Sequence, residues 1–158
     1  MRKRSKYRPK GVQKDPLNWI LNGFTPVRNL DAITTQRIKA HGVIDSVRRG
    51  EATRNDMDAL IAVFNMAEAL VSLGIGGEYV DEVHAGQMAL LVLSRRGIAR
   101  DMRFICTAQE LTAINNAMEI HDAQLEVSTV IDIENGLKII DKAIRSQKAH
   151  TVFQKEAV

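Results

Sequence analysis

The sequence is poor in the residues that would indicate a secreted, membrane-spanning or strand-rich protein. A single cysteine, Cys106, excludes an internal disulfide and fits a reducing compartment. All three prolines lie within the first 26 residues, so proline interrupts no later element. No apolar run is long enough to cross a bilayer, and no apolar stretch with a cleavage site follows the basic N-terminus. We therefore expect a cytoplasmic protein without a membrane segment.

The charge of the chain is unevenly distributed. The 158 residues include 22 basic and 19 acidic side chains, which gives a net charge of +3. Residues 1–14 contain seven of the basic side chains and no acidic one. Residues 15–158 therefore carry 15 basic and 19 acidic side chains, a net charge of −4. The basic character belongs to an N-terminal arm, and the domain that follows is slightly acidic.

Two helices are predicted directly after the arm. The first begins with Asp15 as its N-cap and ends near Gly23. The second covers residues 31–49, with Gly50 as its C-terminal stop. Apolar residues recur along both at helical spacing, and these stripes are Leu17, Ile20, Leu21 and Phe24 in the first and Ile33, Ala40, Ile44 and Val47 in the second.

The third and fourth helices are expected at the centre of the fold. Thr53 and Asp56 have the spacing of a capping box, and the helix that they begin should end at Gly74. Apolar side chains cover most of its circumference, which predicts a central position. The fourth helix covers about residues 78–96 and should stop at Gly97. Its segment "MALLVL" is expected to be buried on several sides.

The last helical region carries two apolar stripes that one straight helix cannot point at the same core. Thr107 and Glu110 form the capping box that begins this region. Two interpretations stay open: a kink near Ser128, or a new helix capped by Thr129 with Asp132 three residues later. The stripes are Leu111, Ile114, Met118, His121 and Leu125, and then Val130, Ile133, Leu137, Ile140 and Ile144.

Together these patterns predict an all-α protein, a helical bundle of five or six helices with an extended basic N-terminal arm. We assign residues 1–14 to the arm, residues 15–150 to a single helical domain and residues 151–158 to a frayed tail.

Several phrases of the sequence resemble a known group of proteins. They are "KYRPKGV", "NWILNGFTPVRNLD", "GEATRNDMDALIAVFNMAEAL" and "RFICTAQELTAINNAMEIHDAQLEV". The chain is similar, over nearly its whole length, to small uncharacterised proteins encoded by phages, prophages and other mobile elements of proteobacteria. The resemblance implies a mobile-element context and assigns no activity and no functional residue.

The arm is the main candidate for a functional element. Its basic side chains suit a phosphate backbone, and Pro9 and Gly11 favour an extended conformation over a helix. We expect a non-catalytic protein whose arm docks on nucleic acid. A solubilising tail, or an arm that packs on an acidic protein surface of its own body or of a partner, stays open as well. The predicted phosphate contacts are Arg2, Lys3, Arg4, Lys6, Arg8 and Lys10, extended by Arg100 and Arg103 from a later basic connection.

A protein partner is the alternative function, as for an adaptor or inhibitor of a host or phage complex. Tyr7 and Trp19 are its candidate contacts, because Trp19 lies off the apolar stripe of its helix. A short segment buried on both faces would also explain Trp19. The apolar third helix suggests self-association, most simply as a dimer.

No catalytic or metal signature is present, and we expect neither an enzyme nor a cofactor. His84 and His121 invite a metal hypothesis, but the chain has no Glu-x-x-His motif, and His121 suits a core position. The "GIGG" segment has no phosphate-loop lysine and is predicted to be a helix–helix turn. Cys106 precedes a helix N-terminus, which lowers the pKa of a thiol, but it has no evident His partner.

Overall fold

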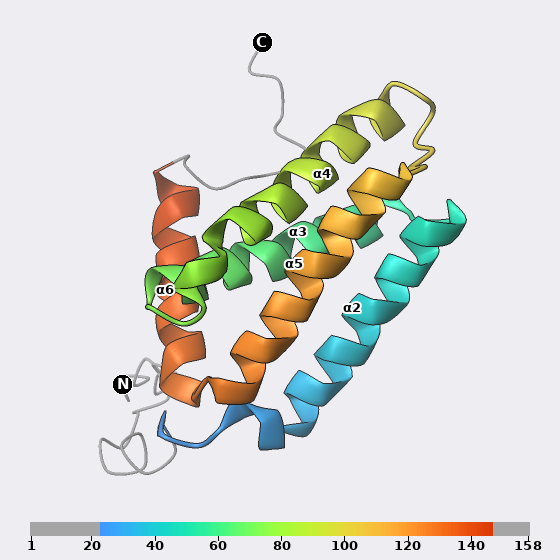
Figure 1. Cartoon of the computed structure of the whole chain (residues 1–158). Helices are drawn as coiled ribbons and strands as arrows, with labels where there is room; N and C mark the ends of the chain where they lie inside the picture. Colours follow the sequence, from blue (N-terminus) through green and yellow to red (C-terminus); the bar gives the residue numbers. More distant parts are fainter. Residues whose placement is uncertain (1–22, 147–158) are drawn as a thin grey trace, which may run out of the picture.

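The structure, a computed structural model, describes residues 23–146, and this part of the chain is helical (Figure 1). The elements are η1 (Val27–Asn29), α2 (Asp31–Arg49), α3 (Arg54–Ser72), η2 (Gly77–Tyr79), α4 (Val80–Ile98), α5 (Ala108–Val127) and α6 (Val130–Arg145). The prediction of an all-α bundle is confirmed for these residues. No helix among them is long and apolar enough to cross a membrane. The predicted arm, the predicted first helix before Gly23 and the predicted tail lie outside the described residues.

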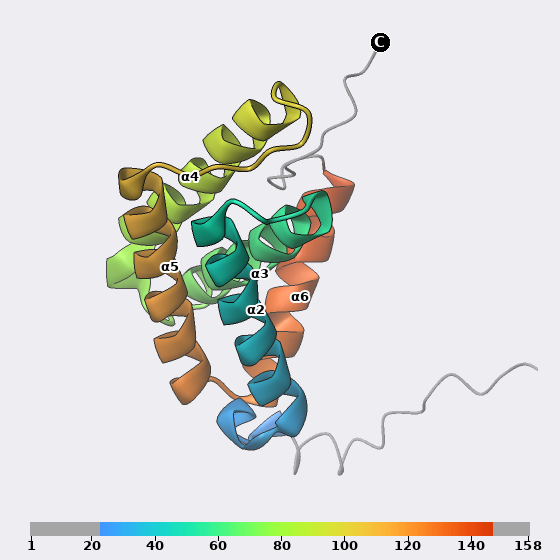
Figure 2. The same ribbon diagram turned by 90° about the vertical axis from the view of Figure 1, so that its right-hand side faces the viewer.

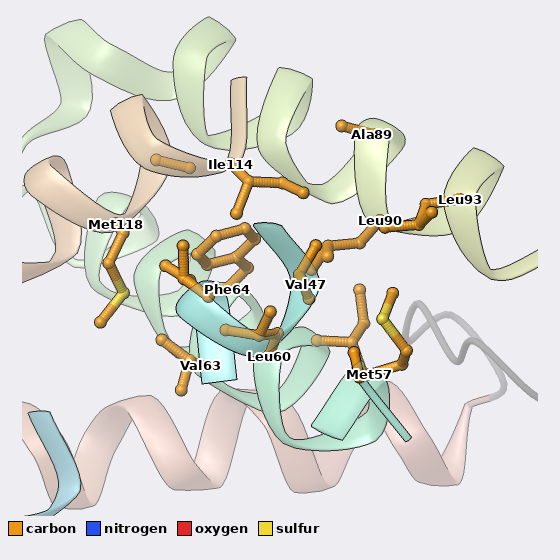
Figure 3. Packing of buried hydrophobic residues seen from close by; sticks show 14 of the residues in the cluster. Val47, Met57, Leu60, Val63, Phe64, Ala89, Leu90, Leu93, Ile114 and Met118 are labelled. Atoms are coloured by element: carbon orange, nitrogen blue, oxygen red, sulfur yellow. The ribbon is translucent and has the colours of Figure 1, made fainter. Parts of the chain in front are cut away.

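Helix α3 lies at the centre of the bundle, as its apolar circumference predicts. It packs against α2, α4, α5 and α6, and in Figure 2 α5 lies to its left, α6 to its right and α2 in front of it. Phe64 of α3 is fully buried and lies within a cluster that includes Val47 from α2 and Ile114 from α5 (Figure 3). The core therefore joins segments that are far apart in the sequence.

The helix boundaries follow the local signals in the sequence closely. Gly50 ends α2 in the left-handed region, with φ of 71°. The α3 and α5 capping boxes form as predicted, and Thr129 forms a third one at the start of α6. There the Thr129 N–H donates to the Asp132 carboxylate at 2.7 Å. The structure thus settles the last helical region as two helices, α5 and α6, and the interpretation of one kinked helix is wrong.

Helix α4 departs from the prediction at both ends. It begins at Val80, after η2, and it continues through Gly97 to Ile98. The predicted stop at Gly97 is wrong because this glycine provides space and does not cap the helix. A Cβ atom at Gly97 would collide with the ring of Phe104, which is fully buried.

The burial of "MALLVL" is also narrower than predicted. Leu90 and Leu93 are buried, whereas Met88 and Val92 are exposed. A helix that packs against α3 on one face and α5 on a neighbouring face still presents its remaining side outward, and Met88 and Val92 lie there.

The chain before α2 is fixed to the junction of α5 and α6. The Val27 N–H donates to the Ser128 carbonyl and the Val130 N–H donates to the Thr25 carbonyl, each at 3.0 Å. Val27 is buried there, while Phe24, one of the predicted stripe residues, is 68% exposed. The two hydrogen bonds place the entry of the described chain at the first turn of α6.

Candidate functional site

Of the predicted nucleic-acid contacts, Arg100 and Arg103 are the two that the structure describes. Both lie in the loop between α4 and α5, and both side chains are exposed. Neither forms an ion pair with another residue in the part of the chain that is described. The arm contacts Arg2, Lys3, Arg4, Lys6, Arg8 and Lys10, and the partner contacts Tyr7 and Trp19, lie outside the described residues.

The loop that carries these arginines has a defined backbone. The Arg100 N–H donates to the Gly97 carbonyl at 3.0 Å, and the Arg103 N–H donates to the Arg100 carbonyl at 3.2 Å. Asp101 and Met102 have φ of 54° and 63°, a left-handed conformation that costs non-glycine residues free energy. The buried ring of Phe104, two residues after Met102, anchors the loop on Gly97.

Arg96 has a structural role at this end of the molecule. Its guanidinium donates to the Glu110 carboxylate (2.8 Å for Nη1 to Oε1) and to the Ile105 carbonyl at 2.9 Å. The pKa of Glu110 is lowered, first by the Arg96 hydrogen bond and then by the Thr107 cap. Arg96 therefore ties the loop to the start of α5 and is not available for a ligand, whereas Arg95 beside it is exposed.

The structure brings a second group of arginines to the same end of the bundle. The C-terminus of α2 lies against the α4–α5 loop, and the thiol of Cys106 lies 3.7 Å from the Val47 carbonyl (Figure 1). Arg48 and Arg49 at this terminus are exposed, but each pairs with a neighbouring carboxylate, including that of Asp45. We call Arg100 and Arg103, which form no such pair with described residues, the loop arginines.

Acidic side chains gather at the opposite end, where α4 begins and α5 ends. A cavity of about 470 Å³ between these helices is lined by Glu78, Glu82 and Glu119, together with the half-exposed Tyr79. Carboxylates near a helix N-terminus are favoured by the helix dipole, which explains Glu82. The loop arginines and these three glutamates therefore lie at opposite ends of the described domain.

The histidines singled out for a metal hypothesis are not brought together. Nε2 of His84 lies 3.1 Å from the Glu68 carboxylate, which also accepts from Gln87. His121 is buried on α5, where burial lowers its pKa to about 4. No group of three or more His, Cys, Asp or Glu side chains suited to a metal ion exists among the described residues.

Cys106 differs from what its place before a helix suggests. Burial raises the pKa of its thiol, and the nearby Glu110 carboxylate adds to this effect. The pKa of the thiol is therefore raised, not lowered as its place before a helix N-terminus suggests.

Sequence reasoning missed an apolar groove between α2, α3 and α6. Its volume is about 780 Å³, and its walls are mainly aliphatic. The signal for it was present in the second apolar stripe of the last helical region, but the periodicity alone does not say that the stripe lacks a partner in the described fold.

The chain was compared with protein-family models, with curated proteins and with solved structures, and none of them matches it.

Proposed function

We propose that this is a non-catalytic helical protein, of the phage or mobile-element type that its sequence resembles, whose basic N-terminal arm docks on nucleic acid. The loop arginines extend the surface that contacts phosphates. The charge distribution supports this: seven basic side chains precede a body of net charge −4. Nucleic acid attracts such an arm through release of counterions, and this attraction requires no catalytic group.

The main support for the proposal is the environment of the Arg100 and Arg103 side chains. Their side chains are exposed and form no ion pair with described residues, although the domain has an excess of carboxylates. Their loop is held by Phe104 and by Arg96, so the two charges are presented at a fixed place. Arginines presented in this way contact phosphates. Such contacts increase the affinity for nucleic acid but do not recognise a base sequence.

Binding of labelled duplex DNA and single-stranded RNA, measured by fluorescence anisotropy over a series of salt concentrations, tests the proposal. The intact chain should bind at low salt, with an affinity that falls steeply as salt rises. Deletion of residues 1–14 should abolish this binding. The double variant Arg100→Ala/Arg103→Ala should reduce the slope of log K against log salt on duplex DNA by about 0.9 for each phosphate that an arginine no longer neutralises.

The matched control is Lys138→Ala/Lys142→Ala. It removes the same charge from exposed positions on α6 and should leave the slope as in the parent protein. Absence of binding by the intact chain at low salt would refute the proposal. An equal effect of the two double variants would show that net charge matters and the loop arginines do not.

A protein-binding adaptor or inhibitor is the second candidate function, with the arm packed on an acidic protein surface. The acidic cavity lined by Glu78, Glu82 and Glu119 favours it, because the domain itself offers a surface complementary to such an arm. A second copy of the chain is then the simplest partner. Salt-sensitive dimerisation that is lost on deletion of residues 1–14 and persists after nuclease treatment, measured by light scattering, would support this candidate over the first.

A further inference from the structure

Helix α6 is the least covered helix of the described fold. Among its residues only Gly136 is buried, and α3 is the one helix against which it packs extensively. Its apolar stripe stands partly open: Leu137 is 55% exposed and Ile144 is 56% exposed. Aliphatic side chains left in water forgo the free energy that burial would give them. The stripe of α6 therefore has apolar surface that a further apolar segment would bury.

The uncovered stripe forms one wall of the apolar groove. α2 forms the opposite wall and α3 the floor, and Figure 2 shows these three helices side by side. Ile33 and Val43 line the groove from α2, and Ile133, Leu137 and Ile140 line it from α6. From Ile133 to Ile144 the groove follows α6 for eleven helical steps, or about 16 Å at the helical rise per residue.

The described chain begins beside the first turn of α6, at the same end of this helix as the groove residue Ile133. Gly23 packs so closely on Ile131, in the first turn of α6, that a Cβ atom would lie 2.6 Å from the Ile131 side chain. The hydrogen bonds of Thr25 and Val27 fix the following residues to the α5–α6 junction. The residue before Gly23 is therefore attached at the first turn of α6, two residues before Ile133, the first residue of this helix that lines the groove.

The eight residues that precede Gly23 have the composition of a groove-filling segment. Their sequence, "DPLNWILN", contains Leu17, Trp19, Ile20 and Leu21, and it has no charged residue after Asp15. As a helix it would be about 12 Å long, which is within the length of the groove. Apolar side chains at positions 17, 20 and 21 would share one face.

We propose that residues 15–22 occupy the groove between α2, α3 and α6 and complete the hydrophobic core. The covalent connection at Gly23 favours this occupant over a second copy of the chain, because a short tether keeps the segment at an effective concentration in the millimolar range. The arm of residues 1–14 is then fixed to the domain at the groove. This inference does not depend on what the arm binds.

Trp19 is the only tryptophan of the chain and reports directly on the segment. In the intact protein its fluorescence should lie at shorter wavelength than that of free tryptophan in water, and acrylamide should quench it weakly. The double variant Leu137→Gln/Ile144→Gln should shift the emission to longer wavelength and raise the quenching constant several-fold. Both substituted side chains are more than half exposed in the described fold, so the helices should persist, as circular dichroism would verify.

The matched control is Met88→Gln/Val92→Gln, which changes two exposed apolar side chains on α4 outside the groove and should leave Trp19 protected. Strong quenching of Trp19 in the intact chain overturns the proposal, and so does quenching that the groove variant does not change. Protection that disappears on dilution, together with a dimer mass in light scattering, also overturns it and assigns the groove to a second copy.

Discussion

Two helix–helix contacts of this molecule, which we call seams, each have a glycine where the helices approach closely. The side chains around the two glycines differ. Between α4 and α5, Gly86 lies against Ala117, and large buried side chains such as Phe64 and Leu90 surround the contact. Between α3 and α6, Gly136 lies against Met66, and the stripe beside it is open to solvent. Close approach of two helices therefore does not by itself make a core. The first seam should determine the stability of the fold, and the second should determine what the fold binds.

The largest expected difference between the two seams concerns their large side chains. Phe64→Ala removes a fully buried ring from the central helix and should lower the free energy of unfolding by about 3–5 kcal/mol. Leu137→Ala at the α6 seam should cost well below ~2 kcal/mol, because this side chain is already 55% exposed. Urea denaturation followed by circular dichroism measures both.

Similar costs for the two substitutions would contradict this distinction between the seams. Leu137→Ala could instead have a large cost in the intact chain that vanishes after deletion of residues 1–22. This result would refine the distinction, because it would show that residues 1–22 bury the Leu137 side chain.

The boundary between the core and the groove should make the stability of the fold depend on pH, because His121 lies there. Burial lowers the pKa of His121 to about 4 from 6.5, opposed in part by Gln124 and by the Asp122 carboxylate, while Arg37 adds to the lowering. The unfolded chain therefore takes up a proton that the native chain does not. Stability is complete above about pH 6.5 and falls as the pH decreases towards 4, by roughly 3 kcal/mol in all.

His121→Leu removes this titration and should flatten the dependence of stability on pH between 6.5 and 4. Met118→Leu changes a buried neighbour on the same helix without changing any ionisable group, so it should keep the dependence of the parent. A pH profile that His121→Leu leaves unchanged would contradict the assignment of a buried neutral imidazole.

The smallest expected effects are those of the glycines themselves. Gly86→Ala places a methyl group against Ala117 and the Ala113 carbonyl, and this overpacking should destabilise the fold by about 1–3 kcal/mol, offset by up to ~1 kcal/mol of helix propensity. Gly136→Ala would meet the thioether of Met66, a flexible side chain that can move aside. Its cost should be near zero. Thermal unfolding of the two variants compares the seams, and equal shifts would show that they are packed alike.

Much of the fold was predictable because its signals are local. The hydrogen bonds of a capping box, such as those between Thr53 and Asp56, lie within one helical turn. A glycine in the left-handed conformation, such as Gly50, ends a helix through its own backbone. Gly97 was misassigned as a stop for the opposite reason. Its role depends on Phe104, whose ring folds back over it, and the sequence shows the two residues without showing the contact.

The candidate site was also predictable from the sequence only in part. The sequence identifies Arg100 and Arg103 as basic, but only their surroundings say that they form no ion pair with described residues while Arg96 is committed to Glu110. The geometry of one bidentate ion pair decides which arginine of the cluster is available. The groove could not be predicted, because an apolar stripe looks the same in sequence whether or not another helix covers it.

Local sequence signals were enough to establish that the described chain is helical, where most of its helices begin and end, and that basic charge is concentrated in the first fourteen residues. These are consequences of periodicity, capping and composition, which act over a few neighbouring residues. Three further properties required the packed molecule. They are which apolar faces are covered, that the loop arginines and the glutamates of the cavity lie at opposite ends, and that α6 leaves a groove open along its apolar stripe. Burial and pairing depend on which distant segments meet, and no local pattern contains that information.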